Sequence, residues 1–240
     1  MRLIELQKED FAKCVNYFQT AKTEKNMFQG ESKSLMKTAH SIAFTMTMLV
    51  QKISNVPEWT TPYLNQLRSD TIQILPSVVW GAKRTLHLYE RASIEDFLRY
   101  VYFFDHKVEH ILLQMHPKRF QSIDSMIDWI KEYPALKRYR KAVSENSNAL
   151  YSRYAELSRT IHGTTIVDQQ ISEGLKDFSK PKVEPLKEKK IMKAVFGNIF
   201  FLLSLFHLED FRQLQLDERT LVCQHLSKVQ IQSLSGLHNS

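Results

Sequence analysis

Glycine and proline are scarce in this chain, with six and seven copies respectively among 240 residues. Sandwiches and barrels of β-strands need a turn after roughly every eight to twelve residues, and those turns draw heavily on these two residue types. Their scarcity therefore argues against both architectures. The expected fold class is all-α, a single-domain bundle of about seven to nine helices over residues 1–240.

Cysteine is rarer still. The two copies, Cys14 and Cys223, lie far apart in the sequence and belong to no Cys-x-x-Cys pair. Because zinc sites and disulfide frameworks depend on closely spaced or numerous cysteines, neither is expected. Both cysteines lie in apolar helical patterns, which predicts reduced core residues and fits a cytoplasmic location.

A continuous apolar run long enough to cross a membrane is also missing. The longest run, 194–208, is interrupted by Gly197, Asn198, Ser204 and His207. It falls short of the ~20 residues that a membrane span needs, so we expect a buried core helix and no membrane partner. Charges are spread over the first ten residues, and no signal peptide is therefore expected.

Positive charge exceeds negative charge. The chain has 33 lysines and arginines against 26 aspartates and glutamates, a net charge of +7, and its isoelectric point is near 9.3. An anionic partner such as RNA suits this balance. Both signs are well mixed, however, and a solvated surface with a lysine excess is equally typical of the composition.

Apolar periodicity predicts a succession of helices joined by short links. They are expected over residues 10–23, 33–53, 62–74, 77–104, 106–115, 122–133, 134–162, 186–213 and 217–233. Asp10 would cap the first helix, and the third would end before Pro76. The polar, lysine-rich residues 164–190 predict a loop with a short helix. This interpretation divides the domain into N-terminal helices (1–76), a core (77–210) and a C-terminal helix and tail (211–240).

The most informative segment is 151–163, Tyr-Ser-Arg-Tyr-Ala-Glu-Leu-Ser-Arg-Thr-Ile-His-Gly. Steps of three and four residues bring side chains together on a helix. Arg153, Glu156, Arg159 and His162 follow one another at steps of three, and Ser158 lies four residues before His162. Gly163 predicts a left-handed C-cap that leaves His162 on an exposed last turn. A histidine that titrates near neutral pH beside phosphate-binding arginines indicates RNA or nucleotide chemistry.

A second polar stripe lies on the predicted helix 77–104 and just beyond it. Intervals of seven, four, four and seven residues separate Arg84, Arg91, Glu95, Arg99 and His106. Such a stripe is usually a solvated helix face. Because the rest of this helix is strongly apolar, the arginines could instead line an internal groove that binds RNA.

Two other groups of residues are weaker candidates for binding sites. Residues 137–141, Lys-Arg-Tyr-Arg-Lys, combine basic and aromatic side chains, so Arg138 and Lys141 suit phosphate contact, or else form a solvated face. His106 and His110 have a metal-compatible spacing, but no nearby carboxylate completes a ligand set. We therefore expect no metal and no cofactor.

The long helix with its Arg/Glu stripe, followed by a helix that ends Leu-Ser-Arg-Thr-Ile-His-Gly, resembles the HEPN superfamily over roughly 77–208. HEPN domains are helical bundles of bacterial antiphage, toxin–antitoxin and CRISPR-associated systems. Active members bring two copies of a motif, arginine, four to six residues and then histidine, together across a dimer interface and cleave RNA without metal. That spacing corresponds here to Ala155, Glu156 or Leu157, whereas the arginines are Arg153 and Arg159.

The resemblance implies a HEPN-like RNA-processing or RNA-cleaving effector, a toxin or antiphage defence component. Metal-free cleavage needs a base, an acid and positive charge on the phosphate. His162 could act as base or acid, Arg153 and Arg159 could clamp phosphate, and Ser158 or Glu156 could orient the imidazole. One helix end does not supply both base and acid, so a symmetric homodimer with two copies of His162 is expected.

Three other interpretations stay open. The chain could be a non-catalytic helical adaptor that binds a partner protein or nucleic acid in a defence or toxin–antitoxin complex. It could be an antitoxin or oligomerisation subunit whose apolar C-terminal helices contact a partner. Locally, His162 could simply hydrogen-bond a neighbouring helix while Arg159 pairs with Glu156 on the surface.

Overall fold

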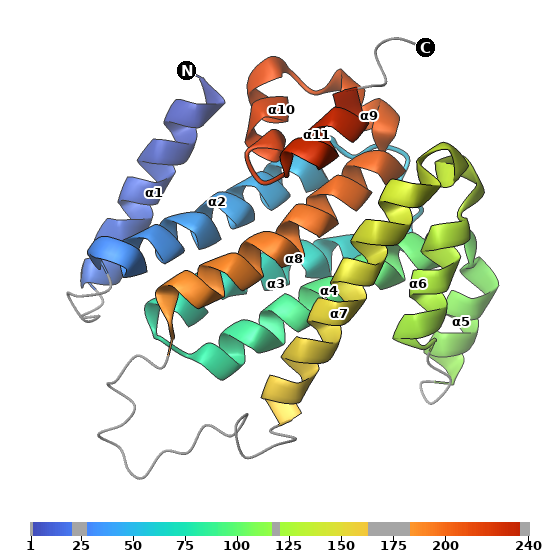
Figure 1. The fold of residues 1–240 in the computed structure, drawn as a ribbon, viewed down its shortest axis with the longest axis horizontal. Coiled ribbons are helices and arrows are strands. Elements are labelled where there is room, and N and C mark those ends of the chain that lie inside the picture. The colour runs from blue at the N-terminus through green and yellow to red at the C-terminus, as the bar shows by residue number, and fades with distance from the viewer. Residues whose placement is uncertain (1, 21–27, 117–120, 163–182, 236–240) are drawn as a thin grey trace.

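A computed structural model describes residues 2–20, 28–116, 121–162 and 183–235. All regular structure within those ranges is helical, and no strand occurs there. The all-α prediction is therefore confirmed. Eleven α-helices and the 3-10 helix η2 make up the described part of the chain (Figure 1). Their bounds are α1 Leu3–Thr20, α2 Gly30–Lys52, α3 Thr61–Val79, α4 Lys83–Asp105, α5 Lys107–Met115, α6 Ile123–Glu132, η2 Pro134–Tyr139, α7 Arg140–His162, α8 Pro185–Phe206, α9 Leu208–Gln213, α10 Leu216–Cys223 and α11 Lys228–Ser235.

Helix α8 crosses the middle of the molecule and packs against α2, α4 and α7. Phe196, Phe200 and Leu203 are fully buried, as are apolar residues on the other sides of the helix. The first half of α8 exposes lysines, but residues 195–205 are buried almost throughout, and a helical segment that is apolar all round is stable only when other elements cover it. The predicted buried helix in 194–208 is therefore confirmed, although α8 ends at Phe206 and α9 begins after His207.

The predicted start of the first helix is wrong. Helix α1 begins at Leu3, whose backbone N–H donates to Asp217 Oδ2 of α10 at 3.1 Å. A carboxylate from another helix thus satisfies a free N–H at this helix start. Asp10 lies inside α1, where its Oδ2 is 2.9 Å from Nε2 of His40 in α2. Asp10 therefore joins two helices instead of capping one.

The predicted helix 77–104 is two helices, and the preceding helix continues through Pro76 to Val79. Burial of Val78 and Val79 in the core stabilises this extra turn against the proline. The helix stops at Gly81, which has a φ of +63°. The N–H groups of Gly81 and Ala82 donate to the carbonyls of Val78 and Ser77, which is a Schellman motif.

Two predicted subdivisions do not follow the helices. The boundary at 76/77 falls inside α3 and the boundary at 210/211 falls inside α9. The predicted helix 134–162 also divides, into η2 and α7. Most of the predicted loop 164–190, and Gly163 before it, lie outside the described residues. Its last residues belong to α8, which begins at Pro185.

The cysteines are less buried than predicted. Both are free thiols at partly exposed positions rather than in the core. Burial, followed by the charge of Asp10, raises the pKa of Cys14 to about 11. A thiol with that pKa stays protonated and unreactive at neutral pH.

A hydrogen-bonded chain joins α4 to the turn between α8 and α9. The hydroxyl of Tyr100 donates to His207 Nε2 at 2.6 Å, and His207 Nδ1 is 3.4 Å from Asp210 Oδ2. Asp210 also accepts from the hydroxyl of Ser54 at 2.5 Å, just beyond α2. Burial lowers the pKa of His207 to about 4 despite the nearby Asp210 carboxylate. The imidazole is therefore neutral at pH 7 and can accept from Tyr100.

Replacement of Tyr100 by Phe should lower the free energy of unfolding by about 1–3 kcal/mol, because Nε2 of the buried His207 loses its donor. Tyr102→Phe is the matched control, since its hydroxyl makes no hydrogen bond within the described residues. Urea unfolding of both variants measures the difference. Equal losses would show that the Tyr100 hydroxyl does not stabilise the fold through His207.

Candidate functional site

The predicted histidine lies at the end of α7. His162 is the last residue of this helix and its side chain is exposed. Arg159, one turn earlier, is exposed as well. An imidazole and a guanidinium are thus available to solvent at the same helix end, where they could meet a phosphate.

Three other predicted catalytic residues have different surroundings. Arg153 Nη1 donates to Glu156 Oε2 at 2.5 Å, and both side chains are about one-third exposed (38% each). The hydroxyl oxygen of Ser158 is buried and has no partner among the described residues. Neither Glu156 nor Ser158 hydrogen-bonds His162. The carboxylate on this helix end therefore neutralises Arg153 instead of orienting the imidazole.

The stripe on α4 mostly contacts its own chain. Arg91 Nη2 lies 2.7 Å from Glu95 Oε1 and 3.0 Å from the hydroxyl of Tyr154 in α7. The same hydroxyl donates to Glu95 at 3.1 Å. Arg99 pairs with Glu95 at 3.5 Å and with Asp96 at 3.6 Å. These charges join α4 to α7 and do not line an open groove.

The two ends of the predicted stripe lie apart from this cluster. Arg84 is exposed on the first turn of α4. His106, after the last residue of α4, donates from Nδ1 to the Tyr102 carbonyl at 2.7 Å and stacks on the Tyr102 ring at 4.0 Å. Of the five stripe residues, only Arg84 is fully available to a phosphate.

The predicted basic patch is remote from His162. Arg138 lies on η2 and Lys141 on the first turn of α7, and both are exposed. Helix α7 has 23 residues, and at about 1.5 Å per residue it is roughly 34 Å long. Lys141 and His162 therefore occupy opposite ends of one helix, so they could contact only an extended ligand together.

A buried charged cluster that the sequence analysis did not predict lies where α4 meets α8. His87 Nε2 donates to Glu188 Oε2 at 2.7 Å, with both side chains almost completely buried. Lys83 Nζ is 3.5 Å from the other oxygen of Glu188. Glu90, also fully buried, has no hydrogen-bond partner for either carboxyl oxygen within the described residues.

The two buried glutamates have opposite pKa shifts. Burial raises the pKa of Glu90 well above its ordinary value, and the charges of Glu188 and Glu156 raise it further, against the opposing effect of Arg153. Burial also acts to raise the pKa of Glu188, but the hydrogen bonds and charges of His87 and Lys83 lower it overall. Glu90 therefore favours its neutral form and Glu188 its ionised form.

The sequence contains a weak signal for this cluster. Lys83, His87 and Glu90 are spaced four and three residues apart, so they share one side of α4. Glu188 is hidden among lysines at 187, 189 and 190, a composition typical of solvent-exposed segments. Burial of a charge within such a segment depends on the position of α8 in the core, which local sequence does not reveal.

A second buried carboxyl pair lies between α3 and α4. Asp70 accepts from Gln66 at 2.7 Å, and both aspartates are buried. Burial and the charge of Asp70 raise the pKa of Asp96 to about 7. The neutral form of Asp96 is therefore much more populated at neutral pH than it would be in a free aspartate. No group of three or more His, Cys, Asp or Glu within the described ranges is arranged to hold a metal ion.

Comparison with protein-family models, with curated proteins and with solved structures finds no match to this chain. In the part of the chain that the structure describes, no helix is both long and apolar enough to span a membrane. Any functional proposal therefore rests on the residues and their arrangement.

Glu90→Gln and Glu188→Gln should change stability in opposite directions, because only Glu188 has a cationic partner, Lys83, and a hydrogen bond to its carboxylate. A raised pKa in Glu90 stabilises the fold at low pH, and this stabilisation is lost as pH rises. The free energy of unfolding of Glu90→Gln, relative to that of the wild type, should therefore increase as pH rises. Glu188→Gln should lose about 3–5 kcal/mol at pH 7, because it breaks a buried ion pair. Urea unfolding from about pH 5 to pH 8 tests both variants. Losses of similar size in the free energy of unfolding would contradict the assignment of a neutral Glu90 and an ionised, paired Glu188.

Proposed function

We propose that this protein is a HEPN-like RNA-processing or RNA-cleaving effector, a toxin or antiphage defence component that acts in the cytoplasm without a metal ion. The observation that supports this proposal is the exposure of His162 and Arg159 together on the last turn of α7. The HEPN resemblance of the segment that carries them agrees with it.

In the proposed reaction, the imidazole of His162 takes the proton from an RNA 2′-hydroxyl. The freed oxygen attacks the adjacent phosphorus, which forms a 2′,3′-cyclic phosphate and expels the 5′-oxygen of the next nucleotide. That leaving oxygen accepts a proton from a second, protonated His162. Arg159 balances the negative charge that develops on the phosphate. A homodimer in which two α7 ends meet would supply both imidazoles.

The remaining predicted residues divide by their surroundings. Arg84, Arg138 and Lys141 are exposed and are proposed to contact RNA phosphates. Arg91 and Arg99 are engaged by carboxylates, and Arg153 is paired with Glu156. These three arginines are proposed to position α4 and α7 rather than to bind RNA directly.

His162→Ala should reduce cleavage of a single-stranded RNA by at least about 100-fold, because general acid–base groups typically contribute this much. The assay contains a metal chelator, compares equal amounts of folded protein and tests products for 2′,3′-cyclic phosphate ends. His116→Ala is the matched control, since His116 is also exposed at a helix end. Equal cleavage by the wild type and His162→Ala would remove His162 from the mechanism.

A non-catalytic adaptor is the second candidate. It is favoured by the separation of Arg138 and Lys141 from His162 along α7 and by the engagement of Arg91, Arg99 and Arg153 within the chain. The adaptor binds a partner protein or nucleic acid without turnover. For nucleic acid, affinity should fall as salt rises.

Both candidates contact RNA through Arg138 and Lys141, so Arg138→Glu with Lys141→Glu should lower the affinity of either one, whereas His162→Ala should leave it unchanged. Turnover separates them, because the effector cleaves the bound RNA and loses cleavage in His162→Ala, whereas the adaptor cleaves RNA in neither form. Fluorescence anisotropy with the same RNA measures binding independently of cleavage.

A further inference from the structure

Helix α5 presents its apolar side chains to solvent. Val108, Ile111, Leu112 and Met115 follow the one-face spacing of three, four and seven residues and are 67%, 46%, 38% and 66% exposed. No residue of α5 is buried. An amphipathic helix normally directs such a stripe into the core. Contiguous exposed apolar surface of this kind usually marks an interaction site.

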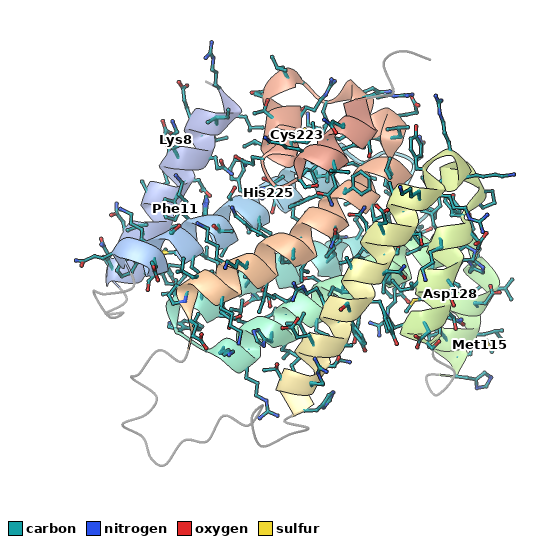
Figure 2. All side chains as sticks on the ribbon, viewed as in Figure 1. Lys8, Phe11, Met115, Asp128, Cys223 and His225 are labelled. Atoms are coloured by element: carbon teal, nitrogen blue, oxygen red, sulfur yellow. The ribbon has the colours of Figure 1, made fainter. Side chains whose placement is uncertain are left out.

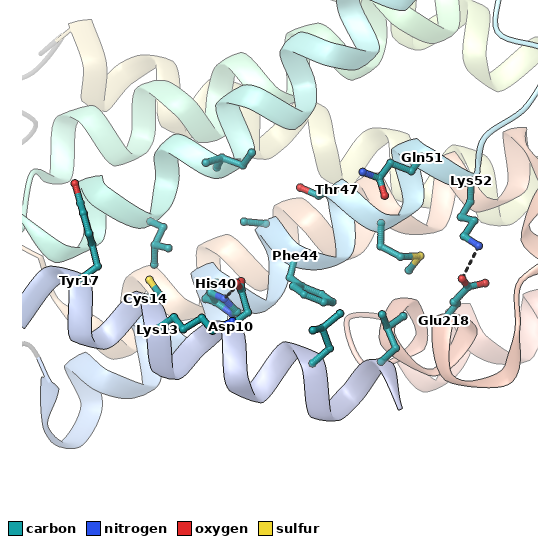
Figure 3. A pocket seen from close by; sticks show the side chains of 16 residues that line it. Asp10, Lys13, Cys14, Tyr17, His40, Phe44, Thr47, Gln51, Lys52 and Glu218 are labelled. Carbon is teal, nitrogen blue, oxygen red and sulfur yellow. Dashed lines mark hydrogen bonds and ion pairs between the residues drawn. The ribbon is translucent and has the colours of Figure 1, made fainter. Parts of the chain in front are cut away.

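An apolar groove of about 780 Å³ lies between α1 and α3, over α2 (Figure 3). Its apolar lining includes Leu6 and Tyr17 of α1, Phe44 and Met48 of α2, and Ile72 and Leu75 of α3. Tyr17 and Ile72 are 69% and 43% exposed. A groove between two helices with a third beneath it suits a further amphipathic helix.

The charges beside the two surfaces are complementary. Within the groove Asp10 lies 2.9 Å from His40 and Lys52 lies 2.7 Å from Glu218, whereas the exposed Lys13 has no ion-pair partner among the described residues. On α5 the ammonium group of Lys107 lies over the Trp59 ring at 4.6 Å. The exposed Glu109 makes no ion pair there. The groove thus offers one unpaired cation and α5 one unpaired anion.

We propose that α5 of one copy of this protein binds in the groove between α1 and α3 of a second copy. Helix α5 is short enough to lie along the groove, because it has nine residues and α1 has 18, or about 14 Å and 27 Å at 1.5 Å per residue. Figure 2 shows Met115 of α5 at one end of the long axis and Lys8 and Phe11 of α1 at the other. One chain therefore cannot fill its own groove.

Different surfaces of the two copies meet in this contact. It therefore either repeats along a chain of molecules or closes, and the smallest closed form is a two-fold dimer in which each α5 lies in the groove of the other copy. It involves no residue of the proposed RNA site, so it goes beyond that function and is independent of it. A nine-residue helix buries less than the about 800 Å² per partner of a standard interface, and association should therefore be weak.

Sedimentation equilibrium from roughly 10 to 500 µM tests the contact. The average mass of the wild type should rise with concentration. Val108→Glu on α5 and Ile72→Glu in the groove should each abolish this rise, because a carboxylate would be buried without a partner. Val229→Glu is the matched control, since Val229 is 66% exposed on α11, away from both surfaces.

Mixing provides the sharper test. Val108→Glu keeps an intact groove and Ile72→Glu keeps an intact α5. In an equimolar mixture each pair of chains can therefore form one contact, so the average mass should exceed that of either variant alone. It should not rise beyond that of a pair. Lys13→Glu should weaken association, and Glu109→Lys in the same chain should restore it. A constant wild-type mass, an effect of Val108→Glu without one of Ile72→Glu, or a mixture that stays at the separate masses would each overturn the proposal. His162→Ala should associate as the wild type does, which separates this test from that of the RNA site.

Discussion

The nearly complete burial of residues 195–205 of α8 is the constraint on which the rest of the structure depends. A helical segment without a solvent-facing side requires neighbours around its whole circumference, and α2, α4 and α7 provide them. Buried polar groups in this packing are stabilised by partners inside the protein. Glu188 has them in His87 and Lys83 at one end of α8, and Tyr100 bonds His207 at the other, whereas the side-chain oxygens of Glu90 and Ser204 have no hydrogen-bond partner among the described residues.

The same constraint divides the positive charges of the chain into two groups. Cations near the packed helices, such as Lys83, Arg91 and Arg99, are held by carboxylates of their own chain. Cations at helix ends, such as Arg84 and Lys141, are exposed. The count of 33 lysines and arginines therefore overstates the number of cations that are available to an anionic partner. The exposed end of α7 combines a cation with an imidazole, which explains why it is the stronger candidate for RNA chemistry.

Much of the helical framework could be predicted from the sequence, because apolar periodicity identifies helices wherever one face is buried. The central helix was the clearest example, since its apolar run has no polar face. The break at Gly81 was missed although glycine is the usual residue after a helix end, because the apolar pattern continues on both sides of it. Continuation through Pro76 depends on the burial of Val78 and Val79, a tertiary effect that local propensity does not contain.

The candidate site was less predictable than the fold. Spacing places Arg153, Glu156, Arg159 and His162 on one helix, and α7 does contain them all. Spacing does not determine which charges pair, so the engagement of Arg153 by Glu156 and of Arg91 by Glu95 required the structure. The exposed stripe of α5 illustrates the same limit. Periodicity identifies an apolar face but cannot tell whether another helix covers it.

The short link between α3 and α4 has a consequence for how the chain folds. These two helices contact each other more extensively than any other described pair, and only residues 80–82 join them. Closing so short a loop costs little chain entropy, and contacts between neighbouring segments form fastest. The α3–α4 hairpin can therefore form early and present one apolar surface. Helix α2, joined to α3 by the longer link 53–60, and α8, distant in the sequence, condense on it later. The Schellman turn at Gly81 thus helps to set the order of assembly as well as the final path of the chain.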